Sequence, residues 1–110
     1  MIEKVVLDFL SENLRVPVTM EKPEVELDEY VLIEKTGSSE SDFVKSATIA
    51  IQSYSTTLYR AAVLNEEVKG AMYNLLSVPK ISKAKLNTDY NFTDTTTKRY
   101  RYQAIYDITY

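Results

Sequence analysis

Charged and hydroxyl side chains carry the chemically active groups of this sequence, because it contains neither histidine nor cysteine. Without these residues the chain has no Ser-His-Asp triad, imidazole base, thiolate nucleophile, disulfide or ordinary zinc site. A carboxylate or lysine mechanism is all that remains, and carboxylates act as acid and base only where they converge in a buried site. No motif predicts such convergence. We therefore expect a protein that is not an enzyme and has no catalytic residues, cofactor or metal ion.

An acidic run lies between residues 20 and 29. Its carboxylates are Glu21, Glu24, Glu26, Asp28 and Glu29. The segment is polar and contains Pro23, which predicts a loop. A solvated loop is the simplest interpretation of this charge, and contact with a basic surface is the functional one.

Basic residues gather near the end of the chain. They are Lys80, Lys83, Lys85, Lys98, Arg99 and Arg101. We considered a solvated sheet face, a contact with an acidic protein surface and a nucleic-acid contact. The last is disfavoured because nucleic-acid binding depends on neutralising phosphates, and 13 Lys plus Arg against 16 Asp plus Glu leave a net charge of −3.

Tyrosine is concentrated in the final segment, residues 99–110. Strict alternation predicts a strand in which one face carries Tyr100, Tyr102, Ala104, Tyr106, Ile108 and Tyr110. These rings are expected either to pack against helices or to form part of a contact with another protein, since tyrosine offers a large area with a polar end. Both interpretations can hold along one strand.

Hydrophobic patterning predicts the elements that position these groups. Helices are expected over residues 2–14 and 58–76, capped by residues 55–57 in the second case and ended by Pro17 and Pro79. Strands are expected over residues 16–18, 30–36, 43–54, 81–90 and 99–110. Turns or loops are expected over residues 20–29, 37–42 and 87–98.

This element order predicts an α+β fold, with a mixed or antiparallel β-sheet of four to five strands covered on one face by two helices. The length of 110 residues favours a single domain spanning residues 1–110. We expect no membrane span, because no apolar run reaches about 18 residues, and no signal peptide, because Glu3 and Asp8 interrupt the first apolar stretch.

Five segments of the chain follow one another in an order that resembles a known protein family. They are Val16-Pro17-Val18, Pro23, Tyr30-Val31 through Glu34-Lys35-Thr36-Gly37, Ile51-Gln52-Ser53-Tyr54-Ser55 and Arg99-Tyr100-Arg101-Tyr102-Gln103-Ala104. This arrangement resembles the tail terminator (tail completion) proteins of long-tailed bacteriophages and their prophages, and it covers nearly the whole chain. Ser38 stands where that family often has a second glycine.

The resemblance implies a structural role. Such proteins form a hexameric ring in the virion that ends tail-tube polymerisation and joins the tail to the head, and the subunit can be monomeric in solution. The implied partners are further copies of the chain, the tail tube protein and the head–tail connector proteins. The implied location is the head-proximal end of the virion tail, assembled in the bacterial cytoplasm. DNA passes through such a ring without being specifically bound, and the family supplies no catalytic residue or cofactor.

A ring requires two different patches on each subunit to meet. We therefore expect the basic residues of one subunit to contact the acidic loop of the next. The candidate interface residues are Lys83, Lys85, Arg99 and Arg101 on one side and Glu24, Glu26 and Asp28 on the other. The alternatives are another neck component, such as a head-completion or stopper protein, and a monomeric module that binds peptides at an exposed sheet edge.

Overall fold

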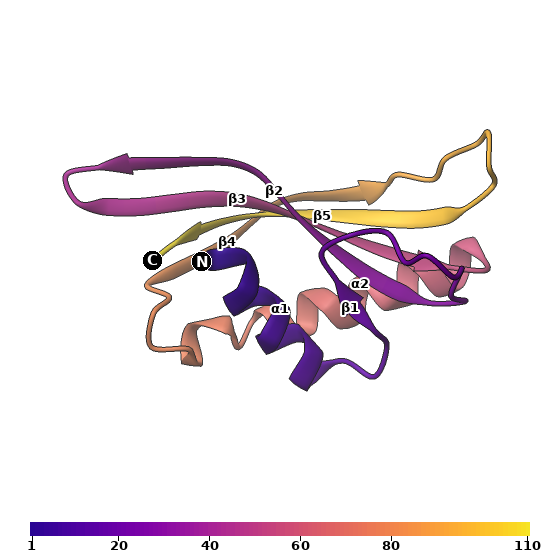
Figure 1. The fold of residues 1–110 in the computed structure, drawn as a ribbon, viewed down its shortest axis with the longest axis horizontal. Coiled ribbons are helices and arrows are strands. Elements are labelled where there is room, and N and C mark those ends of the chain that lie inside the picture. The colour runs from indigo at the N-terminus through magenta and orange to yellow at the C-terminus, as the bar shows by residue number, and fades with distance from the viewer.

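A mixed sheet and two helices make up the two layers of the fold. The computed structural model describes residues 1–110, with the elements α1 (Ile2–Asn13), β1 (Val18–Thr19), β2 (Tyr30–Ser41), β3 (Val44–Ser55), α2 (Leu58–Met72), the 3-10 helix η1 (Leu75–Ser77), β4 (Lys83–Asn91) and β5 (Tyr100–Thr109). The five-stranded sheet has the order β1-β2-β3-β5-β4, in which only β1 and β2 are parallel. Both helices lie on one side of it (Figure 1), so the predicted α+β fold class is confirmed.

The helices form where the sequence periodicity predicts them. In α1, Ile2, Val6 and Leu10 make a buried stripe at helical spacing, and the chain becomes extended at Leu14. In α2, the Thr57 hydroxyl accepts a hydrogen bond of 3.1 Å from the backbone N–H of Arg60, which caps the first turn.

The end of α2 differs from its prediction. The α-helix stops at Met72 and not near residue 76, and η1 carries the chain onward to Ser77. Leu75 is fully buried, and its burial holds this short 3-10 turn against the core. Tertiary packing therefore ends the α-helix about four residues before the predicted end near residue 76, well ahead of Pro79.

The turn between β2 and β3 also differs from its prediction. The segment 37–42 was expected to be the turn, but β2 continues through Gly37 to Ser41, and the turn consists of Asp42 and Phe43. Both turn residues have positive φ, of 51° and 66°. Such turns match the right-handed twist of the paired strands, so the hairpin extends to its tip. Gly37 instead accompanies a register shift after Lys35.

The β2–β3 hairpin projects beyond the helices at one end of the molecule, and the β4–β5 hairpin projects at the other (Figure 1). We call residues 38–47 the β2–β3 arm. The long axis of the molecule measures 44 Å against 26 and 24 Å for the others. The molecule is elongated because its strands extend beyond the helical layer.

A β-bulge explains the irregular hydrophobic pattern of β4. Before Asn87, Ala84 and Leu86 face the helices, and the register shifts between Leu86 and Thr88. After it, Asp89 faces the helices and Tyr90 faces away from them. Uninterrupted alternation over the predicted strand 81–90 would place Tyr90 on the same face as Ala84 and Leu86. That expectation is wrong, because one extra residue inverts the alternation. Strand structure also continues to Asn91, inside the predicted loop 87–98.

The tyrosine stripe of β5 is covered in part. Ala104, Tyr106 and Ile108 are buried in the main core, and Tyr110 packs against it. Tyr100 and Tyr102 are half-buried. Packing against the helical layer is thus confirmed for the C-terminal part of the stripe, whereas a role in contact with another protein stays a prediction.

Phe43 is predicted to destabilise its own turn. A bulky residue with a φ of 66° is strained, and glycine adopts that conformation without penalty. We expect Phe43→Gly to raise the free energy of unfolding by about 1 kcal/mol, measured by denaturant unfolding. Gly37→Ala is the matched control, because Gly37 has a negative φ and open space around its Cα. A less stable Phe43→Gly variant would contradict the assignment of strain.

Candidate interaction site on the open face of the sheet

The sheet face that no helix covers carries a connected set of aromatic, amide and guanidinium groups. Strand register places these side chains in adjacent rows across β2, β3, β5 and β4. One row contains Tyr30, Tyr54 and Arg101, and the next contains Gln52, Gln103 and Tyr90. We call these six residues, together with Arg99, the open-face cluster.

A directional chain of hydrogen bonds joins the cluster. The Arg101 Nη1 donates to the Tyr54 hydroxyl at 2.8 Å, which donates to Gln52 Oε1 at 2.9 Å. Gln52 Nε2 then donates to Gln103 Oε1 at 2.9 Å, and Gln103 Nε2 donates to the Tyr90 hydroxyl at 2.6 Å. Because arginine can only donate, it sets the direction of the whole chain. Both buried glutamines therefore have partners, as buried amides require.

Stacked rings support the polar chain. The Tyr30 and Tyr54 ring centroids are 4.4 Å apart with 9° between the ring planes. The Arg99 guanidinium lies 5.7 Å from the Tyr30 centroid and 5.9 Å from that of Tyr54. The Arg101 guanidinium lies 4.3 Å from the Phe92 centroid. These distances are within the range of cation–π attraction, so the rings and cations hold one another in place.

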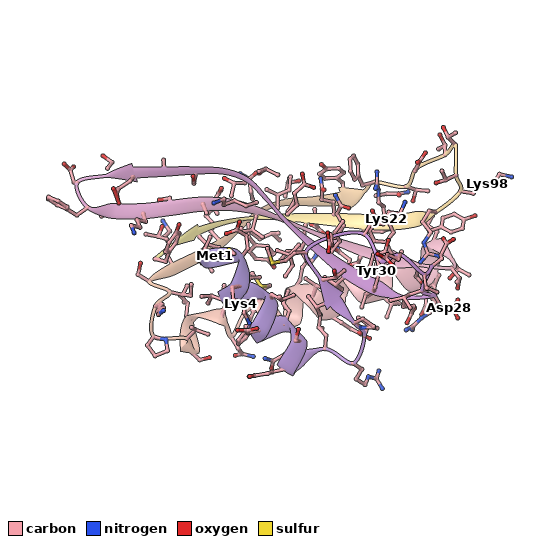
Figure 2. All side chains as sticks on the ribbon, viewed as in Figure 1. Met1, Lys4, Lys22, Asp28, Tyr30 and Lys98 are labelled. Carbon is pink, nitrogen blue, oxygen red and sulfur yellow. The ribbon has the colours of Figure 1, made fainter.

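Loop 20–29 folds over this stack. Arg99 donates to the Leu27 carbonyl and, at 3.3 Å, to the Asp28 carbonyl. As a result, Tyr30 and Tyr54 are only 2% and 3% exposed although they lie on the face without helices. Burial raises the pKa of Tyr30 above its ordinary value. Figure 2 shows Lys22 and Asp28 of the loop at the same end of the molecule as Tyr30.

Glu29 anchors the C-terminal end of loop 20–29. Its Oε2 accepts hydrogen bonds from the Ser55 hydroxyl at 2.8 Å and from Arg60 Nε at 3.2 Å. The hydrogen bond from Arg60, followed by that from Ser55, lowers the pKa of Glu29. The loop is thus fixed to both β3 and α2, which positions its acidic residues near Arg99.

The structure separates the predicted interface residues into two places. Arg99 Nη1 lies 3.5 Å from Glu26 Oε1 of the same chain, and Glu24 lines the same hollow. Arg101 is occupied by Tyr54 and by the Phe92 carbonyl. The contact between neighbouring subunits stays a prediction, but Arg99 already has acidic loop partners within its own chain.

Lys83 and Lys85 lie toward the other end of the sheet. Lys85 is opposite Asp107, which is six residues along β5 from Arg101 and therefore about 20 Å away. Lys83 and Lys85 are exposed and form no ion pair within the chain. The four basic candidates therefore do not form one cluster, because they lie near opposite ends of β5 and β4.

Sequence reasoning did not identify the open-face cluster as a unit. Alternation places Gln52 on the face opposite Ile49 and Ile51, and Gln103 on the face opposite Tyr106, but it does not say that the two amides meet. Pairing of Gln52 with Gln103 depends on register between segments separated by 51 residues. The available signal was that Gln52-Ser53-Tyr54 and Arg101-Tyr102-Gln103 belong to the segments that carry the family resemblance.

A second polar cluster lies between α2 and β4. Asp89 Oδ2 accepts hydrogen bonds from Lys69 Nζ at 3.0 Å and from Asn65 Nδ2 at 2.8 Å. The hydrogen bond from Lys69 lowers the pKa of Asp89, and the same contact raises the pKa of Lys69. Lys69 also contacts the exposed Glu66 at 3.2 Å. This ion pair ties the helical layer to the outermost strand.

The chain contains no group of three or more His, Cys, Asp or Glu side chains placed to hold a metal ion. None of its helices combines the length and apolar character that crossing a membrane requires. Neither the models of protein families nor the curated proteins include a match to this chain.

The glutamine pair is predicted to be energetically coupled. Replacing Gln103 by leucine leaves the buried Gln52 amide without its acceptor, and we expect a loss of about 1–3 kcal/mol in the free energy of unfolding. Replacing both glutamines by leucine should cost less than the sum of the single losses, because neither partner is then left unpaired. Denaturant unfolding of the four proteins in this cycle tests the prediction. Additive losses would contradict a direct interaction.

The Lys69–Asp89 pair is predicted to make stability depend on pH. Because the folded-state pKa of Asp89 is lowered, its contribution is present above the unfolded-state pKa of about 4 and is lost as the pH falls through the folded-state pKa. We expect Asp89→Asn to be less stable at neutral pH and to lose less stability on acidification. Glu66→Gln is the control, since Glu66 contacts the same lysine from an exposed position. Equal acid dependence in wild type and Asp89→Asn would contradict the prediction.

Proposed function

We propose that this protein is a tail terminator of a long-tailed phage or prophage, which caps the tail tube as a ring and forms the surface that joins the head. The proposal rests on the ordered sequence resemblance together with one structural observation. Segments that carry the resemblance occupy three neighbouring strands of the sheet, β2, β3 and β5. Their side chains also build one physical unit.

That unit is the open-face cluster. Tyr30 comes from the first of these segments, Gln52 and Tyr54 from the second, and Arg101 and Gln103 from the third. Stacking and hydrogen bonds connect all five side chains directly. The resemblance therefore follows residues that interact in space, which supports a shared architecture over a chance similarity of composition.

The shape of the subunit supports assembly with further copies. Beyond the short pairing of β1 with Val31 and Leu32, the outer edge of β2 is free, and β4 is the opposite edge strand. The two edges are different surfaces at different sides of one sheet. Contacts between unlike surfaces generate rings when the rotation closes, which is the symmetry that a cap on a tube needs.

Electron microscopy of phage tails assembled with and without the protein tests the proposal. We expect overlong tubes in its absence, because nothing stops tube polymerisation. Adding back the purified protein should restore the normal length distribution. Tails of normal length that fail to join heads would contradict tail termination and favour another neck component.

The free edge of β2 also favours a second candidate, a monomeric module that adds a peptide strand to its sheet. Light scattering after size-exclusion chromatography, run alone and in the presence of tail tubes, separates the two. A ring on the tube ends supports the terminator. A monomer that ignores tube ends but binds extended peptides supports the module.

A further inference from the structure

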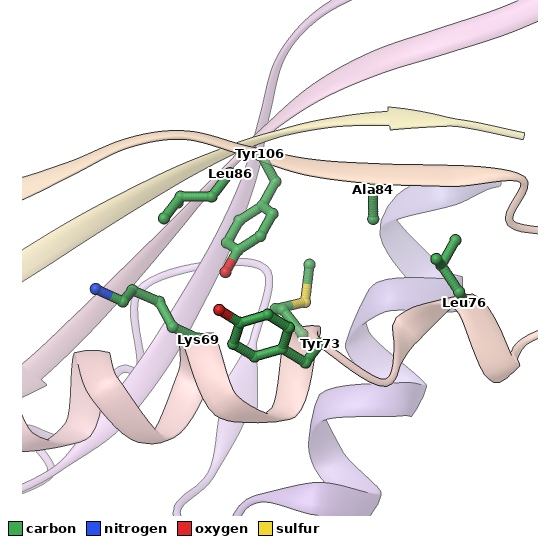
Figure 3. Close-up of a pocket in the computed structure, with 7 residues that line it drawn as sticks. Lys69, Tyr73, Leu76, Ala84, Leu86 and Tyr106 are labelled. Atoms are coloured by element: carbon green, nitrogen blue, oxygen red, sulfur yellow. The ribbon is translucent and has the colours of Figure 1, made fainter.

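An apolar groove lies between the helical layer and the β4 edge of the sheet. Figure 3 shows Tyr73 and Leu76 on one side of it, Ala84 and Leu86 on the other, and the ring of Tyr106 between them. The hollow has a volume of about 210 Å³. Tyr73 and Leu76 remain 86% and 54% exposed at its rim, so large apolar side chains are left in water beside an apolar hollow.

The volume of the groove indicates the size of its occupant. Pockets for small organic ligands are commonly about 300–1,000 Å³, which is larger than this hollow. An apolar cavity of about 150 Å³ accepts a benzene molecule. The groove therefore matches a single aromatic side chain, the kind of group that anchors protein interfaces.

The chain itself presents such a side chain. Phe43, at the tip of the β2–β3 arm, is 100% exposed and contacts nothing in its own subunit. Its backbone has a φ of 66°, where a bulky residue is strained and glycine is preferred. A strained, fully exposed aromatic ring at the end of a projecting arm has no stabilising role within the subunit.

We propose that the groove of one subunit receives Phe43 of a second copy, so that the β2–β3 arm of each subunit docks on the β4 side of the next. Arm and groove are different surfaces, so the contact is head-to-tail, as ring closure requires. The inference rests on the proposed function, for which it names the contact between subunits.

Charge complementarity supports a second copy as the occupant. Asp42 lies in the turn beside Phe43, and Glu40 lies near the end of β2, opposite Lys45. The β4 strand that forms one wall of the groove also carries Lys83 and Lys85, which alternate with Ala84 and Leu86 and so lie on the opposite face of this edge strand, beside the groove and not inside it. Both lysines are exposed and form no ion pair within the chain, so an arm that crosses the β4 edge can bring its acidic residues to them. In this arrangement the arm, and not loop 20–29, is the acidic partner of these two lysines.

The first test separates assembly from stability. Phe43→Gly is expected to form a more stable subunit and yet to weaken self-association by about tenfold or more, measured by sedimentation and by ring formation on tail tubes. Tyr59→Ser is the matched control, because Tyr59 is an exposed aromatic residue outside the arm and the groove. Unchanged assembly of Phe43→Gly would overturn the inference.

A mixing experiment tests the two halves of the contact. Leu76→Glu keeps an intact arm but places a charge in the groove, whereas Phe43→Gly keeps an intact groove. Each variant alone should self-associate about tenfold or more weakly than the wild type, and an equal mixture should give heterodimers and no rings. A charge reversal tests the acidic partner of Lys85. The loss of self-association caused by Lys85→Glu should be reversed by Asp42→Lys. Reversal by Glu26→Lys instead would overturn the arm as the partner of Lys85.

Cross-linking provides the direct readout, because the chain has no cysteine of its own. A chain that carries Phe43→Cys and Leu76→Cys should give a ladder of disulfide-linked oligomers, both at high concentration and on tube ends. Phe43→Cys with Tyr59→Cys should not give such a ladder.

If rings form and control tube length without this cross-link, the inference fails while the proposed function stands. If wild-type protein neither assembles nor shortens tubes, the proposed function fails. Groove variants that lose binding to tube protein while Phe43 variants keep it would assign the groove to that protein.

Discussion

The antiparallel register between β3 and β5 aligns Ile51 with Ala104 and Gln52 with Gln103. The Ile51–Ala104 pair points toward the helices and the Gln52–Gln103 pair points to the open face, so the same register builds the hydrophobic core and the open-face cluster. A slip by one residue would place the isoleucines in water and the glutamines under the helices. The core on one face therefore enforces the polar chain on the other, since neither can change without the other.

Local irregularities adapt this central pairing to the rest of the fold. The bulge at Asn87 turns Asp89 toward Lys69, which links the outermost strand to α2. The two-residue turn at Asp42 and Phe43 keeps β2 and β3 paired far beyond the helices. The bulge increases contact within the subunit, whereas the turn projects an arm whose tip residue, Phe43, contacts nothing in it.

Contacts between Arg99 and loop 20–29 within one chain leave this arginine less available for ion pairs with a neighbouring subunit. Arg99 is 15% exposed and contacts backbone carbonyls of the loop, whereas Glu26 is 76% exposed. The carbonyl contacts therefore hold the loop, and the exposed ion pair adds little. The lysines of β4 remain without partners, which makes that edge a more available basic surface than the end of the sheet near Arg99.

Periodicity in the sequence alone determined the helices, the strand character of residues 99–110 and the α+β class, because these features repeat over a few residues. It also placed Gln52 and Gln103 on the outward faces of their strands. Only the tertiary structure decided that the two amides meet, that the hairpin turns at Phe43 and that Asp89 faces Lys69. Strand register, bulges and turn position depend on pairing between distant segments, and their free energy comes from contacts that no local pattern contains.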